Sequence, residues 1–309
     1  MKNYLLLCGG VGGAKLALGF SKILSDSNYT IAVNTGDDFK HFNLKICPDL
    51  DTVMYTLSNE SDLSKGWGRA NESWEMLSAL KQLGGETWFQ LGDKDLATHI
   101  IRTQLIANGS SLSEATKELT QRFGLKSNIL PMTDDLVETY IQTQNRLLSF
   151  QEYFVKFQCE PSVTDFVFKG LDKAKFNPLI DLEAFDEIVI CPSNPFVSIS
   201  PIIQLDPLNQ FLKSHPERVS VVSPIVNSKS LKGPTSKMMN ELGMDTSVLT
   251  IANYYSEYAR TLFIDSTDYQ EESLIAGMGY KVSLADLVMN NLDSKINLAQ
   301  SVIDYLEAK

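Results

Sequence analysis

The stretch Tyr4–Phe20 reads YLLLCGGVGGAKLALGF, and it decides the fold. Tyr4–Cys8 is a short apolar run that predicts a buried strand, and Gly9–Gly13 supplies a turn. Apolar residues at helical spacing over Ala14–Leu24 predict a helix, and Tyr29–Val33 predicts the next strand. Strand, glycine turn, helix and strand in this order are typical of an α/β core.

Strand and helix patterns return in the second half of the chain. Short apolar runs predict strands over Glu187–Ile190, Val219–Val222, Leu249–Ile251 and Leu262–Ile264. Helical patterns cover Ser236–Leu242 and Lys295–Leu306. Because strands alternate with helices at both ends of the chain, we expect one α/β core with a mostly parallel sheet.

The middle of the chain predicts added helical and antiparallel β elements. Helices are expected over Thr52–Leu57, Glu72–Leu83 and Leu96–Ala107, and after a capping box that begins at Ser111. A β pattern follows at Tyr140-Ile141, Phe150–Phe157 and Val163–Phe168. We therefore expect one domain over residues 1–309, with a core of about 1–57 and 180–309 and an inserted region of about 58–179.

Composition and charge exclude several classes of protein. The net charge is −11 and no Lys/Arg-rich run occurs, so a nucleic-acid partner is not expected. No apolar run approaches the roughly 20 residues that span a bilayer, so no membrane partner is expected either. The scattered cysteines predict reduced thiols in a cytoplasmic protein, and the scattered histidines give no zinc or nucleophile pattern. These residues are Cys8, Cys47, Cys159 and Cys191, and His41, His99 and His215.

The glycine turn predicts a phosphate site. At Gly9, Gly10, Gly12 and Gly13 backbone N–H groups can approach phosphate oxygens without Cβ interference, at the positive end of a helix dipole. The segment GGVGGAK is neither GxGxxG, since position 15 is Lys15, nor a P-loop. The alternative is a tight turn that binds no ligand. Lys15 could contact phosphate or lie in solvent.

Closely spaced carboxylates in the first half of the chain predict a cation site. The four pairs are Asp37/Asp38, Asp49/Asp51, Asp93/Asp95 and Asp134/Asp135. Paired carboxylates repel unless a cation compensates them, and oxygen-rich sites suit Mg²⁺. Plainer alternatives are helix N-caps for Asp51 and Asp95, and a simple turn for Asp134/Asp135.

The first pair is the strongest candidate. Asp37 and Asp38 follow the second strand, in a long irregular stretch over Asn34–Asp49, at the edge where α/β sheets bind ligands. We expect Asp37 and Asp51 to be metal or acceptor contacts, with Asp38 and Asp49 next.

Proline-containing turns follow two of the later strands, and a third precedes a helix. If the strands are parallel, these turns meet the glycine turn at one edge of the sheet, where Ser193, Asn194, Ser223 and Thr235 could donate hydrogen bonds to a nucleotide. Ordinary turn chemistry is the alternative for each. Trp67, Trp88 and Phe89 are candidates for contact with a flat ring, against core packing as the alternative.

These segments together resemble one family. GGVGGAK, VNTGDDF, ICPDLDTVMYTL, KGWGRANESW, WFQLGDKDLATHIIRTQ, LPMTDD, FQEYFV, CPSNPFVSISPI, VSPIV and KGPTSK occur in the order seen in 2-phospho-L-lactate transferases of coenzyme F-420 biosynthesis. The similarity runs from about Leu5 to Asp268. It implies a Rossmann-like, three-layer α/β core and a Mg²⁺-dependent enzyme with small-molecule substrates. The acceptor would be the ribityl hydroxyl of the 5-deazaflavin Fo, which takes phospholactate or phosphoenolpyruvate from a guanosine diphosphate-linked donor, and GMP is released.

The resemblance also implies roles for single residues. Asp51 and Lys94 would contact the deazaflavin, Asp37 and Asp38 would hold the metal, and Asp37 and Asp51 would be the catalytic residues. The donor nucleotide would lie on the glycine turn, with Ser193 and Asn194. A homodimer is expected on the resemblance alone. Archaeal members more often have a Thr-Gly-Thr-Pro-Lys variant where this chain has GGVGGAK. Because of this difference, the resemblance does not identify which phosphoacid is transferred.

Two other functions need different features. A non-catalytic, regulatory nucleotide-sugar binder of a related Gly-rich family would need the glycine turn without the acidic segments PDLDT and LGDKD. A NAD-dependent oxidoreductase would need GxGxxG and an acidic residue at the end of the second strand, where this chain has Asn34. The joint presence of the glycine turn and the acidic segments favours the transferase.

Overall fold

A seven-stranded parallel sheet forms the centre of the protein, in the order β14-β13-β10-β9-β1-β2-β5. The structure is a computed structural model that describes residues 1–62, 65–231 and 233–309. The strands are β1 Tyr4–Cys8, β2 Tyr29–Val33, β5 Asn128–Pro131, β9 Glu187–Ile190, β10 Val219–Val222, β13 Thr261–Asp265 and β14 Lys281–Ala285. All neighbouring pairs in this sheet run parallel, as the sequence predicts.

The direction of winding reverses between β1 and β9. From β1 the chain adds β2 and β5 on one side, and from β9 it adds β10, β13 and β14 on the other. Loops on the two sides of such a reversal diverge and leave a crevice outside the carboxyl ends of the strands. Gly9 follows β1 and Cys191 follows β9, so the glycine turn and the first proline-containing turn border this crevice.

Both faces of the sheet are covered, which gives the expected three layers. Tyr4, Leu6 and Cys8 of β1 pack in one apolar cluster, and Leu5 and Leu7 point into the other. The first cluster includes residues of α1 (Gly10–Ile23), α2 (Pro48–Leu57), α5 (Leu112–Arg122) and α11 (Leu292–Glu307). The second includes residues of α6 (Ser200–Ile203), α7 (Leu208–Ser214), α8 (Thr235–Glu241), α9 (Val248–Tyr254) and α10 (Glu272–Gly277).

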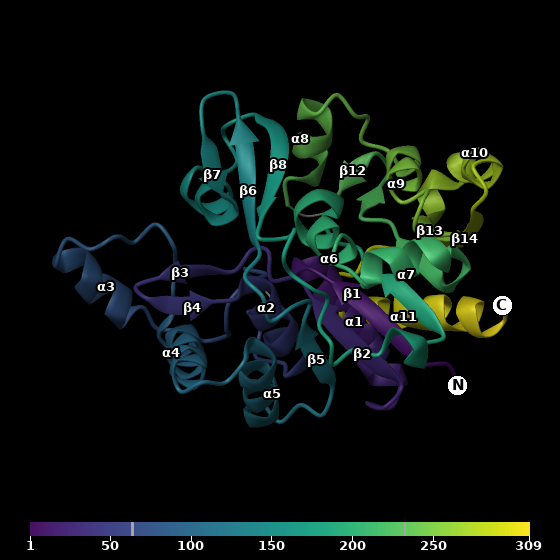
Figure 1. Ribbon diagram of the computed structural model, residues 1–309. Coiled ribbons are helices and arrows are strands. Elements are labelled where there is room, and N and C mark those ends of the chain that lie inside the picture. Colours follow the sequence, from purple (N-terminus) through teal and green to yellow (C-terminus); the bar gives the residue numbers. More distant parts are fainter. Residues whose placement is uncertain (63–64, 232) are drawn as a thin grey trace.

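Smaller elements extend from the core. The hairpin β3 (Phe39–His41) and β4 (Leu44–Ile46) lies with α3 (Glu75–Gln82) and α4 (Asp93–Ala107) on the side of the molecule away from the C-terminus (Figure 1). A three-stranded antiparallel sheet, β7-β6-β8, rises as a separate layer (Leu147–Ser149, Glu138–Thr143, Val163–Lys169), and β11 (Ile225–Val226) pairs with β12 (Lys229–Ser230). None of the described helices has both the length and the apolar character that crossing a bilayer requires.

The structure corrects two predicted strands. The segment Phe150–Phe157 is helical, with a π-helical turn over Glu152–Lys156, because Ser149 Oγ and the Glu152 carboxylate cap each other's backbone N–H groups. Its alternating rings stack at helical spacing, with the Phe150 and Phe154 centroids 5.4 Å apart. Leu249–Ile251 lies inside α9, where the Ser247 side chain accepts from the backbone N–H of Thr250.

Other boundaries also differ from the prediction. The helices α1, α2 and α4 begin at Gly10, Pro48 and Asp93, earlier than expected, and α3 begins later. The irregular stretch after β2 contains the β3–β4 hairpin. The edge strand β14 was not predicted. Strand β5 lies within residues 58–179, so the central sheet draws on the stretch that was expected to be an insertion.

Candidate functional site

A cavity of about 700 Å³ opens at the carboxyl ends of β1 and β9. Its volume is in the range of small-molecule sites. Of the predicted site residues, it is lined by Gly9, Gly10, Gly12, Asp37, Asp51, Ser193 and Asn194. Asp49, Thr235, Lys15, Trp67, Trp88 and Phe89 line it as well. Gly13, Asp38, Lys94 and Ser223 are not among the described lining residues.

The glycine turn is the N-terminus of α1. The helix begins at Gly10, whose φ of +62° favours glycine. A Cβ at Gly12 would lie 2.0 Å from the carbonyl oxygen of Pro192, so this position also needs glycine for the close approach of the two turns. The first N–H groups of a helix have no acceptor within it, and here they lie at the cavity. The turn can therefore bind an anion.

Ser193 and Asn194 hold the second turn in place. Ser193 Oγ donates to the carbonyl of Gly9 over 2.6 Å and accepts from the Gly9 N–H over 3.2 Å. The Asn194 side chain accepts from the backbone N–H of Phe196 over 2.9 Å, as an N-cap of the π-helical turn Pro195–Ile199. These bonds are the turn chemistry that was the plainer alternative for both residues, although both also line the cavity.

Two buried carboxylates meet beside the glycine turn. Asp37 and Asp49 both line the cavity, and Asn34 Nδ2 donates to Asp49 Oδ2 over 3.0 Å. Burial raises the pKa of Asp37 well above its usual value, and the neighbouring Asp49 carboxylate adds to this effect. Burial likewise raises the pKa of Asp49 to about 7, against the opposing hydrogen bond from Asn34. Within the described residues, neither forms an ion pair with a lysine or an arginine.

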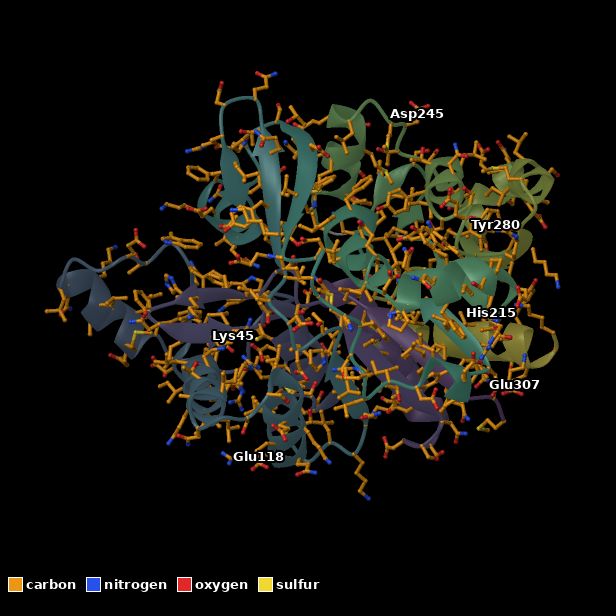
Figure 2. The ribbon with its side chains drawn as sticks, in the orientation of Figure 1. Lys45, Glu118, His215, Asp245, Tyr280 and Glu307 are labelled. Atoms are coloured by element: carbon orange, nitrogen blue, oxygen red, sulfur yellow. The ribbon has the colours of Figure 1, made fainter. Side chains whose placement is uncertain are left out.

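Asp38 forms an ion pair with a lysine, unlike Asp37 and Asp49 among the described residues. Its Oδ2 lies 2.9 Å from Nζ of Lys45. Lys45 belongs to β4 (Figure 2), whose residue Ile46 lines the cavity. Burial raises the pKa of Asp38, and the positive charge of Lys45 opposes the rise. The predicted metal pair, Asp37 and Asp38, is thus adjacent in sequence but divided between two environments.

Asp51 belongs to a second polar group, on the helices α2 and α4. Both of its carboxylate oxygens accept from the guanidinium of Arg102, over 3.0 Å at Nη1–Oδ2. His99 lies between two carboxylates, with Nδ1 at 3.6 Å from Asp51 Oδ2 and Nε2 at 3.4 Å from Asp95 Oδ1. Tyr55 Oη donates to Asp95 Oδ1 over 2.7 Å.

This group corrects the N-cap alternatives. The N-caps are Cys47 for α2 and Gly92 for α4, so Asp51 and Asp95 lie inside their helices. Burial alone would raise the pKa of Asp95, but the interactions with His99, Tyr55 and Arg102 outweigh burial and lower it.

His99, Arg102 and Asn34 were not predicted as site residues. The i, i+3 spacing of His99 and Arg102 places these two on one face of the predicted helix Leu96–Ala107, and that was the available signal for them.

The remaining predicted residues lie as follows. Lys94 is exposed and its Nζ donates to the carbonyl of Ala70 over 3.1 Å. Lys15 Nζ donates to the carbonyl of Met289 over 2.9 Å and its side chain lines the cavity. Asp134 and Asp135 accept from the backbone N–H groups of Ser113 and Lys175, which are long-range structural contacts rather than bonds within a simple turn. Lys232 of the segment KGPTSK lies outside the described residues.

Aromatic side chains form one wall of the cavity. The Phe39 ring meets Phe89 edge to face, with centroids 4.8 Å apart, and Trp88 lies 5.3 Å from His41. Trp88 and Phe89 line the cavity, and Lys156 Nζ lies 5.6 Å from the Trp88 ring. This wall offers apolar contact to a flat ring ligand.

Known proteins are similar to this chain in sequence or in fold. A 2-phospho-L-lactate transferase of Methanosarcina mazei is 37% identical over 302 residues, with 97% of this chain and 99% of the relative covered. A phosphoenolpyruvate transferase of Streptomyces griseus is 34% identical over 312 residues, with 98% of each covered. A crystal structure of a UPF0052 family protein from Bacillus halodurans matches 98% of each chain with a TM-score of 0.61 at 12% identity, which supports the α/β fold.

The family model for 2-phospho-L-lactate transferase CofD matches residues 5–288. That match covers the glycine turn, both acidic groups and every strand of the central sheet except Tyr4, the first residue of β1. Together with relatives more than 30% identical along nearly the whole chain, it shows that the protein belongs to the 2-phospho-L-lactate transferase CofD family.

Proposed function

We propose that this protein transfers a phosphoacid moiety from a guanosine diphosphate-linked donor to the ribityl hydroxyl of the 5-deazaflavin Fo, with release of GMP, in coenzyme F-420 biosynthesis. The relatives' names support the class of reaction and leave two moieties, 2-phospho-L-lactate and phosphoenolpyruvate. The observation that carries the proposal is the single cavity that contains the glycine turn, two buried carboxylates and the Asp51 group.

The donor fits the glycine turn. A diphosphate diester carries negative charge that the N-terminus of the 14-residue helix α1 attracts, and the backbone N–H groups supply hydrogen bonds. Gly10, Gly12 and Thr235 all line the cavity. The aromatic wall with Trp88 is the proposed contact of the deazaflavin ring.

Magnesium fits the acidic residues. Asp37 Oδ1 and Asp38 Oδ1 are buried and lack a hydrogen-bond partner among the described residues. Asp37 and Asp49 place further carboxylate oxygens at the cavity, and Mg²⁺ prefers such ligands. We propose that Asp37 holds the metal with Asp38, as the sequence suggests, or with Asp49, which shares its environment. Bound Mg²⁺ would neutralise charge on the donor phosphates.

The acceptor hydroxyl would lie at Asp51. There the carboxylate would accept the hydroxyl's hydrogen bond, orient its oxygen toward the phosphorus and take its proton. The new bond joins that oxygen to the phosphorus as the bond to the bridging oxygen breaks, and GMP leaves with the bridging oxygen. Lys94 remains a proposed contact of the deazaflavin. The four free thiols support a cytoplasmic location, and the homodimer rests on the family resemblance.

The direct test is a product assay. The purified protein with Mg²⁺, Fo and a guanylylated phosphoacid should yield a phosphorylated deazaflavin and GMP, both detected by mass spectrometry. Donors carrying phospholactate, phosphoenolpyruvate and phosphoglycerate are compared in parallel, which identifies the moiety. Nucleotide binding without turnover for all three donors would support the regulatory alternative and defeat the proposal.

A further inference from the structure

Among the described residues, Arg102 and Asp51 form the one arginine–carboxylate ion pair in which both side chains are buried. Asp51 lines the cavity. The Arg102 side chain is 0% exposed, and it reaches from α4 to α2 to bind Asp51 with both terminal nitrogens. Two parallel hydrogen bonds of this kind fix the plane of a carboxylate, which a single bond does not. The pair therefore sets the orientation of Asp51 at the cavity.

The charge of Arg102 also acts on Asp51. Burial opposes a charged guanidinium, but the carboxylate of Asp51 and other neighbouring groups raise the pKa of Arg102 above its ordinary value. The guanidinium thus stays positive, and Asp51 keeps an adjacent counter-charge even when the cavity is filled and water is excluded.

The neighbouring side chains fix Arg102 in turn. His99 Nδ1 lies 3.3 Å from Nη1, and the other imidazole nitrogen faces Asp95. Asp51, Asp95 and His99 are close enough to share a metal ion, with ligand atoms within 4.8 Å of one another. Arg102 argues against that use, because its guanidinium already binds both oxygens of Asp51 and repels a cation there.

We propose that Arg102 is the positioning residue of the acceptor site: it holds the Asp51 carboxylate so that the lone pairs it leaves unoccupied face the acceptor hydroxyl. A carboxylate has about four lone-pair positions, of which the guanidinium takes two. The inference rests on the proposed function, since it assumes that the acceptor hydroxyl binds at Asp51. It assigns Arg102 to acceptor binding and orientation, and not to the donor at the glycine turn.

Arg102→Lys is the discriminating variant. Lysine retains the positive charge but lacks the planar fork, so Asp51 is paired and free to rotate. We expect the KM for Fo to rise and kcat to fall, each about tenfold, because a misplaced reacting group costs rate as well as affinity. The Kd for GDP, measured by calorimetry, should change less than about twofold, because the glycine turn is untouched. Arg102→Gln, which donates a single neutral hydrogen bond, should be worse than lysine in both acceptor parameters.

A double-mutant cycle separates positioning from general structure. If Arg102 acts through Asp51, the Arg102→Lys/Asp51→Asn protein should have the same residual turnover as Asp51→Asn alone, within about twofold. Arg122→Lys is the matched control, since Arg122 makes an exposed pair with Glu118 over 2.9 Å. Circular dichroism and urea unfolding establish that each variant is folded.

The outcomes are distinct. If the wild-type protein neither binds Fo nor forms product, the proposed function fails. If it does both and folded Arg102→Lys retains wild-type KM for Fo and kcat, the positioning role is overturned while the function stands. Additive losses in the cycle, or failure of both Arg102 variants to fold, would assign Arg102 a structural role and also overturn it.

Discussion

Gly12 and Pro192 approach so closely that a Cβ atom at position 12 would lie 2.0 Å from the Pro192 carbonyl oxygen. One residue follows β1 and the other follows β9, so the contact joins the two strands at which the winding of the sheet reverses. The reciprocal hydrogen bonds between Gly9 and Ser193 lie beside it. Close packing of these two turns is what lets both face one cavity.

The first prediction is that Gly12→Ala separates the two turns. A backbone oxygen cannot move aside as a flexible side chain can, so we expect the free energy of unfolding to fall by about 2 kcal/mol or more. Nucleotide affinity should fall with it, because the N–H groups of α1 shift away from the phosphates. Urea unfolding and calorimetry with GDP measure the two effects.

Gly277→Ala is the control for this variant. Gly277 ends α10, has an ordinary φ and would place its Cβ in open space. The substitution should change stability by less than about 1 kcal/mol, in the stabilising direction. Equal effects at positions 12 and 277 would contradict the packing argument.

The second prediction concerns pH and Asp49. Its pKa is raised to about 7 when the protein is folded and returns to its ordinary value when the protein unfolds. Between these values the folded state binds more protons, so stability is lost as pH rises. Without Mg²⁺, the wild-type protein should lose about 3 kcal/mol relative to Asp49→Asn between pH 4 and pH 7.

The measurement is urea unfolding of both proteins in EDTA across this range. Because the comparison is between two proteins, the titration of groups distant from Asp49 cancels to first order. Asp37 is the exception, because the Asp49 carboxylate raises its pKa in the wild type and not in the variant. A difference that does not depend on pH would show that Asp49 is ionised and compensated in the folded protein.

The third prediction is that Asp37→Asn lowers the turnover of the protein and raises its stability. Metal-dependent turnover should fall at least about 100-fold, because a neutral amide is a poor ligand for Mg²⁺. In EDTA at pH 8 the variant should be more stable than the wild type by about 1–3 kcal/mol, because a buried carboxylate beside Asp49 has been removed.

Asp245→Asn, on an exposed loop, is the control and should change neither property (Figure 2). If the variant at position 37 loses both activity and stability, protein groups stabilise the Asp37 carboxylate, and no cation is needed to compensate its charge. The assay is turnover against Mg²⁺ concentration, alongside urea unfolding.

Much of the fold could be predicted from the sequence because local signals agree with the tertiary structure. The glycine turn, the buried strands and the edge at which they end all follow from runs of apolar residues and from turn residues. The strand predicted at Phe150–Phe157 was wrong because alternating aromatics are typical of a strand, whereas the capping box at Ser149 and Glu152 starts a helix there. Strand β14 was missed because it is a partly exposed edge strand with little apolar pattern.

The site was predictable in part, for a different reason. Asp37 and Asp51 could be named because they stand in acidic segments next to strand ends and helix starts. Their partners could not be named. Asp51 pairs with Arg102, which lies 51 positions further along the chain, and the sequence does not show which distant residues lie close together in space. The assignment of Asp38 to the hairpin lysine, Lys45, depends on a hairpin that the sequence did not predict.

The fourth prediction is that Trp88→Leu weakens the acceptor alone. Loss of the indole face should raise the KM for Fo about 3- to 10-fold, the range expected for one aromatic contact, and leave the KM for the donor unchanged. Trp74→Leu is the control, because Trp74 pairs with Trp67 and is not among the described residues that line the cavity. Equal changes in both KM values would show that the substitution alters the shape of the cavity and does not remove a specific contact with the deazaflavin ring.

The last prediction is that Asp51→Asn loses both turnover and stability. Turnover should fall at least about 100-fold, because the amide cannot accept the acceptor's proton. Stability should fall by about 3 kcal/mol, since Arg102 is left buried without its counter-charge. GDP affinity near the wild-type value would show that the folded variant retains the glycine turn. Near-wild-type turnover, with the same loss of stability, would reduce Asp51 to one half of a buried ion pair and move the chemistry to Asp37.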